Sequence, residues 1–238
     1  MNDTNLSSRY LLNEIPDEQK KISEFGYKAC NLSLAKKWQF PVPDTVFLSG
    51  GLVKEIYEKK RVPAEILSHF KNKLLAIRPS PVIDLSLKNE PFLYIGLDDR
   101  SIEVLKKTVG IKKASQIYLS FLRMFSATVY NLDLENCNEL RRLLENPKRP
   151  ESVFEEGSPY QISRIKKLIS LETGLNFPRS ISEQLIEVIT SIYKGWISPT
   201  QKILRDVSGR KSEESVSYTH LRAHETVLEL VCRLLLEK

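Results

Sequence analysis

The chain has 238 residues, 41% of them hydrophobic and 28% charged, and its formal net charge is +6. This length and composition are ordinary for a soluble globular protein with one large core or two small ones. No apolar run reaches membrane-spanning length and the first ten residues are polar, so the sequence predicts a cytoplasmic protein without a membrane partner. The cysteines, Cys30, Cys137 and Cys232, lie too far apart to indicate a disulfide framework or a structural zinc site.

The basic residues are spread along the chain and mixed with acidic ones, as in the stretches 55–61 and 139–149. No RNA-binding signature and no zinc-finger spacing accompanies them. This pattern is typical of solvated helix faces, so a basic helical module that binds nucleic acid is the weaker interpretation.

Residues 1–110 have a mixed pattern of helix and strand. A short loop from Glu24 is expected to run into a helix that ends at Lys37, before the prolines of F-P-V-P at 40–43. Strands are expected at Thr45–Ser49, Leu74–Arg78 and Pro91–Leu97.

The helix expected at Ser101–Val109 is followed by Gly110, which readily adopts the positive φ of a helix C-terminus. From residue 111 to about 207 the pattern is helical throughout, and apolar side chains recur at three- and four-residue spacing. Two buried stripes are expected: Ile117, Phe121, Met124, Phe125 and Thr128 in the first helix, then Leu185, Ile189, Ile192 and Trp196. Helix starts with a serine cap are expected at Ser158, Ser180 and Ser198. The stretch Glu145–Gly157 is expected to be an exposed loop.

Several short stretches, in a fixed order, carry a resemblance to a known family. In the mixed part they are G-Y-K-A-C-N-L at 26–32 followed by F-P-V-P at 40–43, L-L-A-I-R at 74–78, and L-Y-I-G-L-D-D at 93–99. In the helical part they are the stretch 118–129, E-T-G at 172–174 with F-P at 177–178, E-Q-L at 183–185, and the stretch 191–205. Over roughly residues 20–207 the chain resembles the N-terminal nucleotide-binding region of pyruvate, phosphate dikinases and phosphoenolpyruvate synthases. The stretch 93–99 points to the dikinase branch.

The resemblance implies an α+β fold: the N-terminal part of an ATP-grasp-like nucleotide-binding domain with a large all-helical insertion. It also implies a phosphotransferase that converts ATP, pyruvate and phosphate to phosphoenolpyruvate, AMP and pyrophosphate, with Mg²⁺ on the nucleotide. Lys28 and Arg78 are the residues expected to bind the ATP phosphates. Pyruvate and phosphoenolpyruvate would bind to domains outside this chain, and the complete enzyme could be a homodimer. No catalytic residue and no metal ligand is expected in this fragment, which is expected to be inactive alone.

The sequence departs from the family pattern at three places. Tyr27 and Ala29 stand where the opening motif has glycines, and Pro79 stands where the family has serine after the arginine. The stretch Asp84–Pro91 replaces a loop that is thought to cover the terminal phosphate. A second hypothesis follows: a degenerate, non-catalytic nucleotide-binding or interaction module.

Three regions are expected: residues 1–110 as the mixed part, 111–209 as a helical subdomain, and 210–238 as a tail that is not native. Residues 216–238 look like translated adapter or vector read-through and have the pattern of an amphipathic helix. His220 and His224 stand four apart, a spacing that could hold zinc on a helix face, but no third ligand is evident and the zinc interpretation is disfavoured.

Overall fold

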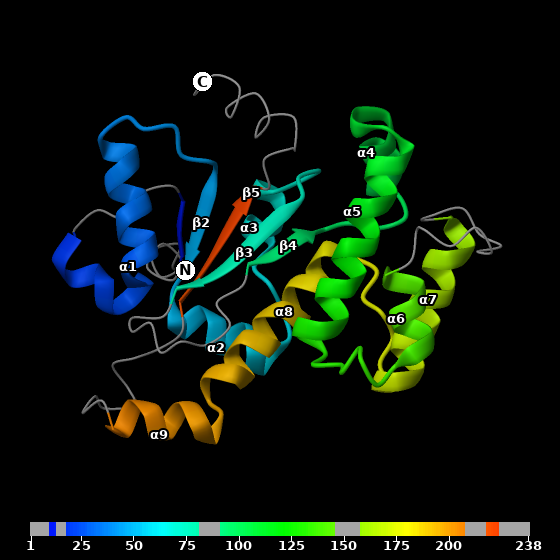
Figure 1. The fold of residues 1–238 in the computed structure, drawn as a ribbon. Helices are drawn as coiled ribbons and strands as arrows, with labels where there is room; N and C mark the ends of the chain where they lie inside the picture. Colours follow the sequence, from blue (N-terminus) through cyan, green and yellow to red (C-terminus); the bar gives the residue numbers. More distant parts are fainter. Residues whose placement is uncertain (1–9, 13–17, 81–90, 146–157, 208–217, 224–238) are drawn as a thin grey trace, which may run out of the picture. The chain divides into compact units, whose positions relative to one another are not determined.

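A computed structural model of the chain describes residues 10–12, 18–80, 91–145, 158–207 and 218–223 (Figure 1). The chain divides into two compact units. Unit 1 comprises Met1–Phe92 and Leu185–His224, and unit 2 comprises Leu93–Gln184 and Glu225–Lys238. The regions expected from the sequence, with a boundary at residue 110, stay a prediction. Of the loop expected at Glu145–Gly157, residues 146–157 lie outside the described residues, and so do residues 84–90 of the departure at Asp84–Pro91.

The sheet has five strands in the order β1-β2-β5-β3-β4. The strands are β1 (Tyr10–Leu12), β2 (Thr45–Leu48), β3 (Leu75–Ser80), β4 (Phe92–Ile95) and β5 (Tyr218–Ala223). The three strands expected from the sequence correspond to β2, β3 and β4. Figure 1 draws β5 as the orange-red arrow that lies between β2 and β3, and it is antiparallel to both.

Strand β5 corrects the expectation of an amphipathic helix over residues 218–223; the rest of the stretch 216–238 lies outside the described residues. Its local sequence is ambiguous, because Tyr218, Thr219 and Leu221 are also acceptable strand residues. Pairing with two strands that lie far away in the sequence decides the outcome, and local propensity does not. His220 lies in a strand, so the helix-face spacing that a zinc site would need is not formed there.

The core of unit 1 is organised around a row of side chains across the three central strands. Leu221 is opposite Val46 on β2 and Ile77 on β3, and all three are 0% exposed. Such directly opposed apolar pairs are the main stabilising contacts of a sheet. Helix α2 (Gly50–Lys59) contacts β5.

The opposite face of the sheet is covered by α1 (Glu18–Lys37), which contacts β2, β3 and β5. Successive strand residues point to opposite faces, so Phe47 faces away from its neighbour Val46. Phe47 packs against Ala29 and Cys30 of α1. Cys30 is buried and therefore acts as a small core residue.

The other helices of unit 1 are α3 (Ala64–His69), the part of α8 (Ile181–Trp196) from Leu185 onward, and α9 (Pro199–Val207). The apolar stripe expected on α8 is confirmed, because its four members are buried: Leu185, Ile189, Ile192 and Trp196.

Unit 2 is helical apart from residues of β4. Its helices are α4 (Ser101–Val109), α5 (Ile111–Met124), the π-helical turn η2 (Phe125–Val129), α6 (Asn138–Glu145) and α7 (Pro159–Thr173). Aromatic rings form its core: the ring centroids of Phe121 and Phe125 are 5.5 Å apart, and those of Phe125 and Phe177 are 5.2 Å apart. Ile117, Phe121 and Phe125 of the expected stripe are buried.

The helix starts and one helix end follow the sequence signals closely. The Ser158 hydroxyl accepts a hydrogen bond from the Gln161 N–H at 3.3 Å, with Pro159 in the first turn. Ser198 caps α9 in the same way, through a 3.4 Å bond from the Gln201 N–H. At Ser180 a reciprocal capping box forms with Glu183. Gly110 ends α4 with φ 86°, which a residue with a β-carbon rarely adopts.

One buried side chain joins two stretches of unit 2 that are 88 residues apart. The Gln184 carboxamide accepts a 2.7 Å bond from the Gly96 N–H and donates a 3.0 Å bond to the Leu97 carbonyl. Gln184 is fully buried, so both polar atoms of its amide depend on these partners. The Ser101 hydroxyl donates to the Gly96 carbonyl at 3.1 Å, which completes the fixation of this loop.

We expect Gln184→Ala to lower the free energy of unfolding by about 2–3 kcal/mol, because it leaves a part-buried N–H and a buried carbonyl without partners. Gln184→Glu keeps the shape but removes the donor, so a loss of similar size is expected. The measurement is urea unfolding followed by circular dichroism. Lys194→Ala, an exposed position on the same helix, is the control and should stay within about 0.5 kcal/mol of the parent. Equal stability of the Gln184 variants and the control would contradict the assignment.

Candidate functional site

The opening motif does not form a loop, which corrects the expectation of a short loop from Glu24. Gly26, Lys28 and Ala29 all lie inside α1, which begins at Glu18. Inside a helix the backbone N–H groups bond to carbonyls four residues earlier, so they are not free to bind phosphate. Tyr27 and Ala29 replace the glycines of the family pattern and form helices more readily than glycine does, which accounts for the continuous helix.

Lys28 and Arg78 are brought to the same face of the sheet. His220 is the partner of Phe47 on one side and of Arg78 on the other, so these three residues form one row across the sheet. Phe47 points toward α1, and the same row places Arg78 on the α1 side. Both Lys28 and Arg78 are exposed.

A direct contact also joins the two elements. The Lys28 ammonium group donates a hydrogen bond to the Pro79 carbonyl at 3.3 Å, one residue beyond Arg78. In the part of the chain that the structure describes, neither Lys28 nor Arg78 forms an ion pair. Their positive charges are therefore not neutralised by a neighbouring carboxylate there, and they can attract an anion. An ammonium group binds phosphate as a mobile point charge and a guanidinium group binds it as a two-pronged donor.

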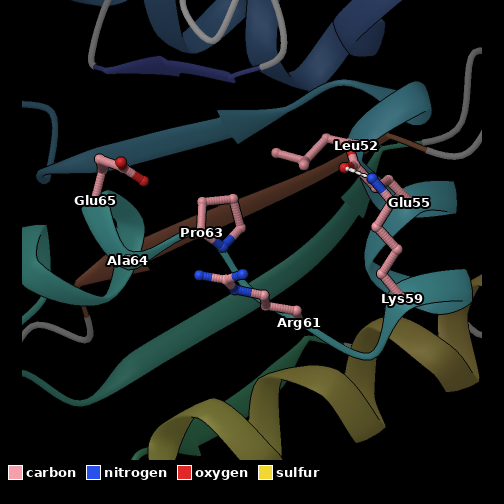
Figure 2. Close-up of a pocket in the computed structure, with 7 residues that line it drawn as sticks. All are labelled: Leu52, Glu55, Lys59, Arg61, Pro63, Ala64 and Glu65. Atoms are coloured by element: carbon pink, nitrogen blue, oxygen red, sulfur yellow. Dashed lines mark hydrogen bonds and ion pairs between the residues drawn. The ribbon is translucent and has the colours of Figure 1, made fainter.

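A shallow pocket elsewhere in unit 1 has a volume of about 270 Å³ and is lined by Leu52, Glu55, Lys59, Arg61, Pro63, Ala64 and Glu65. Figure 2 shows Leu52, Glu55 and Lys59 on α2, with Pro63 and Arg61 on the segment that follows the helix. The Lys59 ammonium group forms a 2.7 Å ion pair with Glu55. Neither Lys28 nor Arg78 lines this pocket, so it is separate from the predicted phosphate site.

His69 is part of an ion-paired cluster that the sequence pattern did not show. Its Nε2 lies 2.8 Å from one carboxylate oxygen of Asp44, and the Lys73 ammonium group lies 2.8 Å from the other. Asp44 precedes β2 and Lys73 precedes β3, so the cluster joins the entrances of two strands that are not neighbours. His69 thus has a structural role.

A second polar cluster lies in unit 2, around Asp99. The Lys166 ammonium group is 2.7 Å from an Asp99 oxygen, and the Tyr118 hydroxyl donates to the same oxygen at 3.0 Å. Lys166 also lies over the Tyr118 ring at 5.3 Å. The hydrogen bond from Lys166 is the main cause of the lowered pKa of Asp99. Burial is the main cause of the raised pKa of Tyr118. This cluster fixes α7 against α5.

Within the described ranges, no group of three or more His, Cys, Asp or Glu side chains is arranged to hold a metal ion. Among the same residues, every helix is too short or too polar to cross a membrane.

Comparison with known proteins gives one relative at low identity. The chain is similar to a protein named "Pyruvate, phosphate dikinase, chloroplastic" from Mesembryanthemum crystallinum. The two sequences are 25% identical over 169 residues, which cover 68% of this chain and 18% of the relative. The chain thus spans about a fifth of the length of that relative. No family model matches the chain. This similarity suggests a kinase or phosphotransferase family.

The Asp99–Lys166 pair predicts a weak dependence of stability on pH. Asp99 has a lower pKa in the folded state than in the unfolded state, so its contribution is present above its ordinary pKa near 3.8 and is lost as pH falls through the lower folded value. Lys166→Met should reduce stability at pH 7, and the difference from the parent should shrink as the pH is lowered below 4. Because Asp99 is 79% exposed, we expect less than about 1 kcal/mol from the charge pair.

Thermal unfolding of both proteins between pH 7 and pH 2.5 is the measurement. Lys167→Met, an exposed neighbour that forms no ion pair with a described carboxylate, serves as the control and should show no such convergence. A difference between Lys166→Met and the parent that stays constant down to pH 2.5 would contradict the assignment to Asp99.

Proposed function

We propose that this chain binds the phosphates of ATP and is part of a phosphotransferase of the pyruvate, phosphate dikinase type. The observation that carries the proposal is the placement of Lys28 and Arg78, 50 positions apart in sequence, on one face of the sheet with a direct contact between their elements. The similarity to a protein named pyruvate, phosphate dikinase supports the same function. The reaction itself would need parts of the protein outside this sequence.

In this proposal the Arg78 guanidinium binds two oxygens of one phosphate, and the flexible Lys28 side chain binds a neighbouring phosphate. Lys28 would exchange its bond to the neutral Pro79 carbonyl for a bond to an anionic oxygen, which is stronger. Phosphate binding would use these two side chains only, because the backbone N–H groups of the opening motif are already bonded within α1.

The described residues suit phosphate and do not suit Mg²⁺. Two cations repel a divalent metal ion, and no cluster of carboxylates lies among the described residues. Mg²⁺ is therefore proposed to arrive as the ATP complex, held by the phosphate oxygens. Bound Mg²⁺ would neutralise part of the negative charge of the phosphates.

A second function is favoured by the helix that runs through the opening motif. Without the backbone N–H donors of a glycine-rich loop, phosphate binding depends on two exposed charges and should be weak. A degenerate, non-catalytic nucleotide-binding or interaction module fits this observation. The two functions differ in affinity, and a binding measurement separates them.

The test is isothermal titration calorimetry of the chain with Mg·ATP. We expect binding, and we expect Lys28→Ala and Arg78→Ala each to weaken it about tenfold, the loss of one charge-assisted hydrogen bond. Arg78→Lys keeps the charge but not the two-pronged geometry, and should recover only part of the affinity. Lys112→Ala, an exposed lysine of unit 2, is the matched control with the same change in net charge.

Binding that is weakened equally by Lys28→Ala and Lys112→Ala would show that net charge alone attracts the nucleotide, and would contradict the assigned site. Absence of Mg·ATP binding by the folded parent chain would remove the nucleotide-binding proposal. The interaction module would then be the better account.

A further inference from the structure

The central position of the sheet is held by a segment that is remote in sequence from both of its neighbours. Strand β5 begins at Tyr218, whereas β2 ends at Leu48 and β3 ends at Ser80. The register is continuous on both sides, from Leu48 opposite Thr219 to Thr45 opposite Arg222, and from Ser80 opposite Tyr218 to Leu75 opposite Ala223. Without β5, β2 and β3 would each have a row of unpaired N–H and carbonyl groups inside the unit.

The lining of this position is apolar and buried. Val46 and Ile77 are 0% exposed, and they flank Leu221, which is also 0% exposed. Phe47 and Ala76 are buried on the opposite face, next to α1. An occupant must therefore be extended, must run antiparallel to both strands, and must place an apolar side chain opposite Val46 and Ile77.

We infer that the space between β2 and β3 is a strand-acceptor site, and that the segment Tyr218–Ala223 is a separable ligand for it. Recognition combines main-chain hydrogen bonds on both sides with one apolar anchor, Leu221, which is the chemistry of strand addition to a sheet. The site requires no particular sequence outside the strand, so it accepts the segment whether it is attached to the chain or supplied separately.

The inference is independent of the proposed nucleotide site, although the two are neighbours. Arg78 and Pro79 pair with His220 and Thr219, so the occupant holds the backbone that carries Arg78. The test below measures folding and peptide binding and uses no nucleotide.

The experiment uses the full chain with Leu221→Asp, which places a charge in the buried row and weakens the attached strand. The midpoint of thermal unfolding should fall by about 10 °C. Amide hydrogen exchange should accelerate about 100-fold in β2 and β3, while α5 and α7 of unit 2 keep their protection. Leu221→Val, which keeps an apolar strand-forming side chain, should stay close to the parent.

A synthetic peptide of residues 216–225 is then added. It should bind the Leu221→Asp chain and reverse at least half of the decrease in the midpoint temperature of unfolding. It should also slow amide hydrogen exchange in β2 and β3, because a ligand that binds the folded state stabilises that state. The same peptide with Leu221→Asp should have no effect, and the parent chain should not bind the normal peptide. Leu221→Ala, a milder change, is the second variant in case the aspartate prevents folding.

Unchanged exchange in β2 and β3 of the Leu221→Asp chain would overturn the inference, because β5 would then not be part of the sheet. Failure of the normal peptide to bind either the aspartate or the alanine variant would also overturn it, because the segment would not be separable.

Discussion

Unit 1 depends on the pairing of β5 with β2 and β3. The opposed side chains Val46, Leu221 and Ile77 form the centre of its sheet, and they come from three separate parts of the sequence. Directly opposed apolar pairs stabilise a sheet only when the register is correct, because a shift of one residue turns each strand over. The same register places Phe47 and Arg78 on the face covered by α1. Core and candidate site therefore depend on one set of strand pairs.

Lys28 and Arg78 place two positive charges on one face of the sheet, although the chain has no phosphate-binding loop at the opening motif. Each residue is exposed on its own element, and the hydrogen bond to the Pro79 carbonyl holds the lysine near the end of β3. As the proposed phosphate site, these two exposed charges would attract anions less strongly as the salt concentration rises. A loop of aligned N–H groups would bind more tightly, but here the helix uses these groups internally. Under the proposed function, Tyr27 and Ala29 weaken phosphate binding, because they favour a helix over a glycine-rich loop.

Local signals in the sequence predicted most of the helices, but few of the contacts between residues that are far apart in the sequence. Serine caps at Ser158 and Ser180 and the glycine at 110 act within one turn, so they could be read correctly from a few residues. Strand β5 and the Gln184 clamp depend on partners more than 80 residues away, and no local pattern encodes them. The prediction of a short loop beginning at Glu24 was wrong, because the residues there continue the helix that begins at Glu18. The assignment of Lys28 and Arg78 to phosphate stays a prediction.

The late position of β5 sets an order of events during synthesis. The described part of unit 2 lies between Leu93 and Gln184, and its contacts are mostly between helices that are close in sequence. It can therefore fold as soon as that stretch has left the ribosome, because domains fold as units while the chain is made. Unit 1 has to wait for residues 218–223, although β2 and β3 emerged long before. During that interval two incomplete strands are exposed, and a chaperone that covers extended apolar segments would have its main task there.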